Sequence, residues 1–194
     1  MDTFTKIIKE ATGYDIESAS RFDFTPHISL LEFKKNARIP KLNLSPDYFS
    51  IITKGTIFLY WSKDQRHNTI INFKRKGEVL RPAIEIGSVK CGELYAKCLT
   101  PVTIYSIKRD HLCSCTFQDK KLSDFYFGLL TNDINSTYCQ LKMLKEANIE
   151  KRYQIFKEEY ADIFNTISDR MIANYLGVHY TTLARMKVRL LKNK

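Results

Sequence analysis

The pattern of apolar positions is clearest over residues 167–190, where it predicts two short amphipathic helices separated by a tight turn. Ser168 suits the N-cap of the first helix, with Asp169 in its first turn, and Gly177 suits a left-handed C-cap. The apolar face of this helix consists of Met171, Ile172, Tyr175 and Leu176. The second helix is expected to begin near Thr181, and its inner face consists of Leu183, Met186 and Leu190.

The outer face of the second helix is basic and rich in hydroxyl groups. It consists of Thr181, Thr182, Arg185, Lys187 and Arg189. A helix pair with a tight turn and such a second helix fits the description of a helix-turn-helix, which favours double-stranded DNA as the partner. The alternative is an ordinary helical hairpin whose charged face is simply solvated.

The periodicity differs in the earlier parts of the chain. Residues 1–20 predict a short helix. Between Phe22 and Ile107, short β-type runs alternate with polar and glycine breaks, which predicts an antiparallel barrel, roll or sandwich. Within this region Gly55 is expected to form a hairpin turn between two strands.

Apolar residues return to helical spacing over residues 122–146, which predicts one long helix. They are Phe125, Leu129, Leu130, Ile134, Tyr138, Leu141 and Leu144. Such a stripe suits either a core helix or a parallel dimer helix. A further helix is expected after it, with Ile149, Tyr153 and Phe156 on its apolar face.

The composition changes this picture in one respect, which is charge. The chain has 194 residues, a net charge of +10 and a pI near 9.3, so a polyanionic partner is favoured. No apolar run approaches the roughly 20 residues that span a bilayer, and the N-terminal segment lacks a signal peptide's apolar region. We therefore expect a cytoplasmic protein that does not enter a membrane.

The sequence offers little for catalysis or metal binding. Its five cysteines are odd in number and irregularly spaced, which favours structural thiols. Its histidines are scattered, and there is no Ser/His/Asp set, metal-ligand spacing or phosphate loop. We expect no enzymatic activity, no catalytic residue and no metal site.

The order of a β-rich segment, a long helix and a terminal helix-turn-helix resembles the Crp/Fnr family of bacterial transcription regulators. The most specific match is in the C-terminal segment, which resembles the family's Ile-Ala-x-Tyr-Leu-Gly signature in the branch common in Bacteroidetes. The matching positions are Ile172, Ala173, Tyr175, Leu176, Gly177, Leu183 and Arg185. A weaker match covers the strand and turn from Tyr48 to Gly55 and the segment from Phe73 to Glu78.

This resemblance implies an α+β fold: an antiparallel β-roll like a cyclic-nucleotide-binding jelly roll, a long dimerisation helix and a winged helix-turn-helix. The implied boundaries are residues 1–121 for an N-terminal helix with the roll, 122–147 for the dimerisation helix and 148–194 for the DNA-binding domain. The partners implied are double-stranded DNA and a second copy of the chain through residues 122–147. The resemblance also leaves open RNA polymerase as a partner.

The resemblance places the second helix in the major groove as the recognition helix. The positions that match its base- and phosphate-facing sites are Tyr180, Thr181, Thr182 and Arg185. Lys187 and Arg189 complete the predicted DNA-binding set as nonspecific phosphate contacts. Arg185 can donate two hydrogen bonds to a guanine edge, and the two threonines near the helix N-terminus can hold a phosphate. One departure is Ala184, where the family commonly has Ser.

The effector site departs more strongly from the family. Gly92 and Glu93 stand where an Arg and a small hydroxyl residue are expected, and Pro82 falls near the expected Glu. We therefore expect neither cyclic AMP nor cyclic GMP as effector. The remaining ligand-binding candidates are Gly77, Glu78, Arg81 and Lys90.

Two other sensor types known in the family do not fit the sequence. No cysteine precedes Cys91, which excludes the N-terminal iron–sulfur cluster of the oxygen-sensing branch, and His67 and His111 are too isolated to suggest haem. We predict no cofactor and leave open an unidentified small-molecule effector in the roll. The predicted function is a sequence-specific DNA-binding regulator; the alternative is a small-molecule-binding sensor module whose C-terminal helices do not bind DNA.

Overall fold

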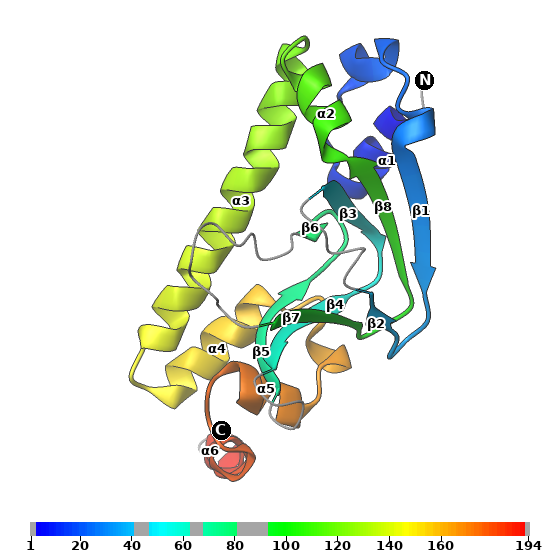
Figure 1. The fold of residues 1–194 in the computed structure, drawn as a ribbon. Helices are drawn as coiled ribbons and strands as arrows, with labels where there is room; N and C mark the ends of the chain where they lie inside the picture. Colours follow the sequence, from blue (N-terminus) through cyan, green and yellow to red (C-terminus); the bar gives the residue numbers. More distant parts are fainter. Residues whose placement is uncertain (1–2, 41–46, 63–67, 81–92, 193–194) are drawn as a thin grey trace.

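The structure, a computed structural model, describes residues 3–40, 47–62, 68–80 and 93–192. Within them the fold is α+β, as predicted. Two antiparallel sheets form a roll, a long helix lies along one side of it, and a group of shorter helices lies at its lower end (Figure 1).

The first helix is shorter than the sequence suggested. Helix α1 (Thr3–Thr12) ends where Gly13 takes a left-handed backbone conformation and its N–H donates to the Lys9 carbonyl at 2.9 Å. The predicted helix over residues 1–20 is therefore wrong beyond Thr12, and the chain continues in two short 3-10 turns, η1 (Glu17–Arg21) and η2 (Thr25–His27).

The roll is built from eight strands in two sheets of four. One sheet has the order β1-β8-β3-β6 and the other the order β2-β7-β4-β5, with every pair antiparallel. The strands are β1 (Ile28–Phe33), β2 (Arg38–Ile39), β3 (Tyr48–Lys54), β4 (Ile57–Ser62), β5 (Asn68–Lys74), β6 (Val79–Leu80), β7 (Glu93–Cys98) and β8 (Val102–Lys108).

The chain crosses from one sheet to the other between β1 and β2, β3 and β4, β5 and β6, and β7 and β8, so the two strands of each of these pairs are not hydrogen-bonded to each other. The crossing points lie near Asn36, Gly55, Gly77 and Pro101. The predicted hairpin at Gly55 is therefore wrong: β3 pairs with β6 and β8, whereas β4 pairs with β5 and β7. The apolar residues between the two sheets are buried. Their pattern along the chain predicts strands, but it does not show which strands pair with each other.

Gly55 is required at its corner by both backbone conformation and space. Its φ is +85°, and a Cβ at this position would lie 2.1 Å from the carbonyl oxygen of Pro101. This carbonyl belongs to the β7–β8 corner, so two sheet crossings meet at Gly55.

After the roll come α2 (Arg109–Thr116) and α3 (Lys120–Lys145), the long helix predicted from the sequence. Asp119 caps α3 by accepting a hydrogen bond from the Leu122 backbone N–H at 2.9 Å. The helix is about 39 Å long at 1.5 Å per residue. Its first turns are held in the core by Leu122, Phe125 and Leu129, which pack against α1 and the strands beneath it.

The chain ends in α4 (Ile149–Glu159), the 3-10 turn η4 (Phe164–Thr166), α5 (Asp169–Tyr175) and α6 (Tyr180–Lys192). These helices share one hydrophobic cluster with the roll, which we call the C-terminal core. Its large members are Tyr60, Ile70 and Phe73 of the roll and Tyr153, Phe156, Tyr160, Tyr175, Leu183 and Met186 of the helices. The cluster thus includes residues on both sides of the predicted boundary between residues 147 and 148.

The predicted helix-turn-helix has its two helices where the sequence placed them, but the predicted wing has no counterpart among the described residues. Helix α6 continues to Lys192, and no strand follows it in the described part of the chain. The wing was implied by family resemblance alone, without a strand pattern of its own in this sequence.

We predict that Gly55→Ala lowers the free energy of unfolding by about 2–4 kcal/mol, because a strained φ and a clash with the Pro101 carbonyl combine. The matched control is Gly128→Ala in α3, where nothing lies within 4 Å of a new Cβ. There the better helix former should stabilise by about 0.5–1 kcal/mol. Urea unfolding monitored by circular dichroism measures both. Equal effects of the two substitutions would contradict the proposed role of Gly55.

Candidate nucleic-acid interface

Helices α5 and α6 are joined by the turn that the sequence predicted. Ser168 caps α5, with its Oγ accepting from the Met171 backbone N–H at 3.4 Å. At the other end, Gly177 has a φ of +67°, and its N–H donates to the Asn174 carbonyl at 3.1 Å. The Val178 N–H donates to the Ala173 carbonyl at 3.0 Å. These two bonds form a Schellman motif, which ends α5 and turns the chain into α6.

A residue of α4 supports this turn. Arg152 donates from Nη1 to the Leu176 carbonyl at 3.0 Å, so a guanidinium group lies at the negative end of the α5 dipole. The sequence does not predict this contact, because a helical pattern shows which face of α4 is apolar but not which backbone group an arginine on α4 will reach.

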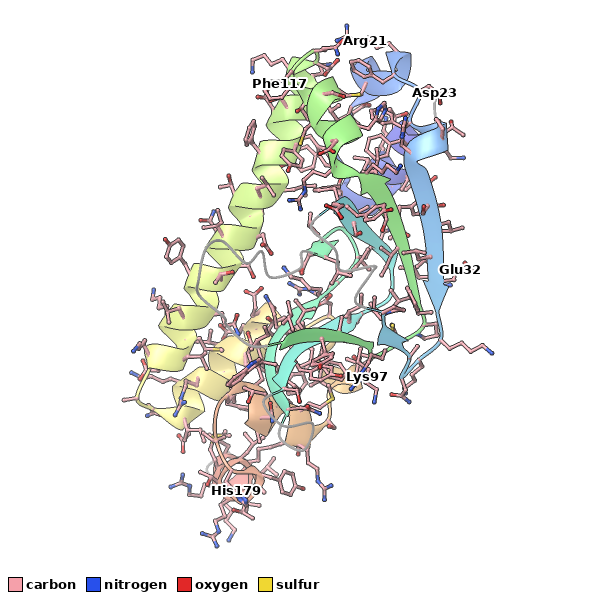
Figure 2. The ribbon with its side chains drawn as sticks, viewed as in Figure 1. Arg21, Asp23, Glu32, Lys97, Phe117 and His179 are labelled. Atoms are coloured by element: carbon pink, nitrogen blue, oxygen red, sulfur yellow. The ribbon has the colours of Figure 1, made fainter. Side chains whose placement is uncertain are left out.

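The inner face of α6 is buried as predicted. Leu183 and Met186 are fully buried in the C-terminal core, and Leu190 is partly buried against it. The opposite face of α6 is thereby fixed toward the outside of the molecule. Figure 2 shows His179, the residue just before α6, at the end of the molecule opposite Phe117.

Four of the predicted DNA-binding residues lie exposed on the first two turns of α6. They are Tyr180, Thr181, Thr182 and Arg185. The start of the helix is ordered by His179, whose Nδ1 lies 2.8 Å from the Thr181 Oγ1 and 3.4 Å from the Thr181 backbone nitrogen. The Arg170 guanidinium lies over the Tyr180 ring at 5.8 Å, which places a further cation beside this face.

The other two predicted residues already have partners within the chain. Lys187 Nζ lies 2.8 Å from both carboxylate oxygens of Asp169 in α5. Partial desolvation is the largest single effect on the pKa of Lys187 and lowers it, but the hydrogen bonds and charges of Asp169 and Tyr153 together outweigh it, and the pKa is raised. Arg189 is more exposed, with Nη2 lying 3.6 Å from a Glu150 carboxylate oxygen. The predicted residues in the N-terminal half of α6 are thus exposed, whereas Lys187 is held by Asp169 and the exposed Arg189 lies beside Glu150.

A shallow depression runs along the outer face of α6. It is lined by Thr182, Ala184, Arg185, Val188 and Arg189. Ala184 leaves this surface with a methyl group beside Arg185. An arginine beside small apolar side chains is the kind of surface that reads a guanine edge next to a thymine methyl.

Of the ligand-binding candidates in the roll, two are described. The Gly77 N–H donates to the Ile52 carbonyl at 2.8 Å, and the Glu78 carboxylate accepts from Arg75 Nε at 3.2 Å. Both groups thus serve the β5–β6 corner. The other two candidates, Arg81 and Lys90, and the departures at Pro82 and Gly92 lie outside the described residues, as do His67 and Cys91.

A pocket of about 240 Å³ lies between the β5–β6 corner, α3 and α4. Its charged lining consists of Lys74, Arg75, Glu78, Asp133 and Glu159. The buried Lys74 amine is ion-paired with Asp133 of α3. The pocket therefore combines cations with carboxylates that already balance them. Among the described residues, no group of three or more His, Cys, Asp or Glu side chains could hold a metal ion.

Helix α3 carries an apolar stripe on its exposed side. Phe127, Ile134 and Leu141 are 60%, 48% and 52% exposed, and they recur every seven residues. Leu130, Thr137 and Leu144 recur every seven residues between them, which completes an a/d heptad pattern. The Thr137 hydroxyl donates to the Asp133 carbonyl at 2.9 Å, so this polar group is satisfied within the helix.

No helix in the described part of the chain is long and apolar enough to span a membrane. No family model matches the sequence, and no curated protein matches it.

Solved structures, in contrast, match the fold over most of its length. A cyclic nucleotide-binding domain containing protein from Listeria monocytogenes has a TM-score of 0.73 at 16% identity, covering 91% of this chain and 88% of that one. FixK2 from Bradyrhizobium japonicum has a TM-score of 0.65 at 17% identity, with 86% and 85% covered. A protein described as a Crp/Fnr-family transcriptional regulator from Eubacterium rectale has a TM-score of 0.66 at 13% identity, with 100% and 85% covered. The chain therefore has the fold of the Crp/Fnr-type regulators.

Proposed function

We propose that this protein is a homodimeric, sequence-specific DNA-binding transcription regulator that places α6 in the major groove. The observation that carries the proposal is that α6 has one buried face and one exposed face. Leu183 and Met186 are fully buried, while Thr181 and Arg185 on the opposite face are exposed. A helix held in this way presents a rigid row of side chains to a partner.

The chemistry of the exposed face suits a DNA groove. Arg185 can donate two parallel hydrogen bonds to the O6 and N7 of guanine. Thr181 and Thr182 lie in the first turn of α6, where hydroxyl groups and backbone N–H groups can hold a phosphate. The net charge of +10 supplies a general attraction to DNA that weakens with salt. The fold likeness to proteins described as transcription regulators agrees with this function.

The alternative is a small-molecule-binding module whose C-terminal helices do not bind DNA. In that case Thr181, Arg185 and Arg189 would be expected to pack against the roll. All three are exposed, which favours the DNA-binding proposal. The proposal includes no enzymatic activity. An effector other than cyclic AMP would bind in the roll, and RNA polymerase would be a further partner.

The dimer would form through α3. Its a/d stripe extends from Phe127 to Leu144, which is about 26 Å of helix. Burying such a stripe against a second copy removes large apolar side chains from water, which is the usual driving force of a parallel coiled coil. A two-fold dimer presents two copies of α6, so the DNA sites should be two-fold symmetric, with half-sites about one helical turn apart.

We predict that Arg185→Ala weakens binding to a DNA site selected from random duplexes by about 10–100-fold and relaxes the preference at one base pair. Fluorescence anisotropy over a salt series measures the effect. The matched control is Lys121→Ala, which removes one positive charge from an exposed position at the far end of α3. Wild-type protein that shows no salt-sensitive binding, or equal losses in the two variants, would refute the proposal for α6.

We also predict that Ile134→Glu makes the protein monomeric at micromolar concentration, because it places a carboxylate at the centre of the a/d stripe. Ile134 is 48% exposed within the chain, so the substitution should leave the thermal unfolding of the monomer nearly unchanged. Asn135→Glu adds the same charge at an exposed position beside the stripe and should leave the dimer intact. Sedimentation velocity distinguishes the two. A wild-type protein that sediments as a monomer would show that α3 does not dimerise.

A further inference from the structure

Strand β5 lies at the edge of its sheet, with β4 on one side and α5 on the other. The side chain of Asn174 in α5 pairs with the backbone of this edge. Its Oδ1 accepts from the Ile70 N–H at 2.6 Å, and its Nδ2 donates to the Asn68 carbonyl at 2.8 Å. One amide side chain thus satisfies a donor and an acceptor of the edge strand, as a neighbouring strand would.

A second polar contact joins the next corner of the roll to the end of α4. Arg75, which follows β5, donates from Nη1 to the Glu159 carbonyl at 2.9 Å and to the Asp162 carboxylate at 2.8 Å. The same guanidinium group lies over the Tyr160 ring at 5.2 Å. A cation therefore lies at the C-terminal end of α4, where the helix dipole favours it.

Between these two contacts lies a buried polar group within the C-terminal core. The Tyr160 hydroxyl donates to Asn72 Oδ1 at 3.1 Å, and the Tyr175 hydroxyl lies 3.1 Å from that of Tyr160. Burial raises the pKa of Tyr160 to about 12 and also raises the pKa of Tyr175. Both phenols therefore stay neutral and serve as hydrogen-bonding groups. Strand β5 therefore holds α4 and α5 by contacts near its start, its middle and its end.

We propose that Asn174 and Arg75 are positioning residues that lock the helix-turn-helix onto β5 of the same chain and thereby fix the direction of α6. This inference rests on the proposed DNA-binding function. The hydrogen-bonded turn at Gly177 joins α6 to α5. The orientation of α5 against β5 therefore also sets the orientation of α6. In a dimer, two fixed angles specify one separation between half-sites. The roll thus determines which half-site spacing is read, while the outer face of α6 determines which bases are read.

The contact between Asn174 and β5 can be tested by substitution, because Asn174→Ala removes its two hydrogen bonds without weakening α5 itself. Alanine is a better helix former than asparagine, so a loss of docking would not come from a loss of helix. The matched control is Asn165→Ala, which removes an exposed asparagine of η4. For Arg75→Ala the control is Lys76→Ala, an exposed neighbour of equal charge.

Hydrogen exchange on the full-length protein tests the docking without DNA. The Ile70 amide should exchange about five- to tenfold faster in Asn174→Ala, as expected for the loss of one hydrogen bond, and at the wild-type rate in Asn165→Ala. Unchanged exchange in Asn174→Ala would overturn the proposed lock.

Selection of binding sites tests the consequence for DNA. Wild-type protein is offered random-sequence duplexes of about 40 base pairs, long enough for two half-sites. We expect one dominant spacing for the wild type and both controls. In Asn174→Ala and in Arg75→Ala, each measured separately, the same half-site sequence should appear, with the preference for that spacing reduced about five- to tenfold.

The outcomes separate the two proposals. The same half-site with an unchanged spacing preference in both variants would overturn the positioning role while leaving DNA binding intact. No motif recovered by the wild type would overturn the proposed function and the spacing role with it. A lost half-site sequence in a variant whose thermal unfolding matches the wild type would also overturn the positioning role, because it would show that the residue acts on base recognition.

Discussion

The packing of four aromatic rings between the roll and the C-terminal helices is the interaction on which the rest of the arrangement depends. Phe73 of β5 lies 5.4 Å from the ring of Tyr160 and 5.4 Å from that of Tyr175, and Phe156 lies 5.2 Å from Tyr175. Tilted and edge-to-face rings at these separations bury large apolar areas and resist sliding. Because the cluster includes β5, α4 and α5 together, the roll and the helix pair behave as one packed body in which α6 has a defined direction.

This constraint also explains which surfaces are left outside. Helix α3 uses one side to pack Leu122, Phe125 and Leu129 into the core, and its other side carries the a/d stripe. Helix α6 uses one side to reach the C-terminal core and exposes Arg185 on the other. Both helices therefore have an inner face that stabilises the chain and an outer face available to a partner. We interpret the first outer face as the dimer seam and the second as the DNA-reading surface.

The sequence predicts those features of the fold that depend on neighbouring residues. Ser168, the helical spacing and Gly177 specified the α5–α6 turn, because caps and a left-handed C-cap act over a few residues. The strands were also found, but the hairpin at Gly55 was wrong, because the same local pattern suits a tight turn and a crossing between sheets. Helix α1 was overextended past Gly13 for a related reason, since apolar spacing alone does not mark where a helix ends.

The candidate site was predicted only in part, because contacts between distant segments have no local pattern. Asn174 occupies an outward position of its helix and reads as a solvent-facing residue, yet it pairs with β5 more than 100 positions earlier in the chain. Lys187 reads as part of the basic outer face, but Asp169 already holds its amine. The exposure of Arg185 was predicted correctly, because exposure opposite a buried face follows from helical geometry alone.

Hydroxyl-radical footprinting of the dimer on a selected DNA site tests the central claim most directly, because it maps where the two copies of α6 lie. If α6 is the recognition helix of a dimer fixed by the roll, two protected patches should appear on one face of the duplex, about one helical turn apart. A single protected patch would contradict the account. Uniform cutting at protein concentrations at which the DNA is bound would contradict it as well.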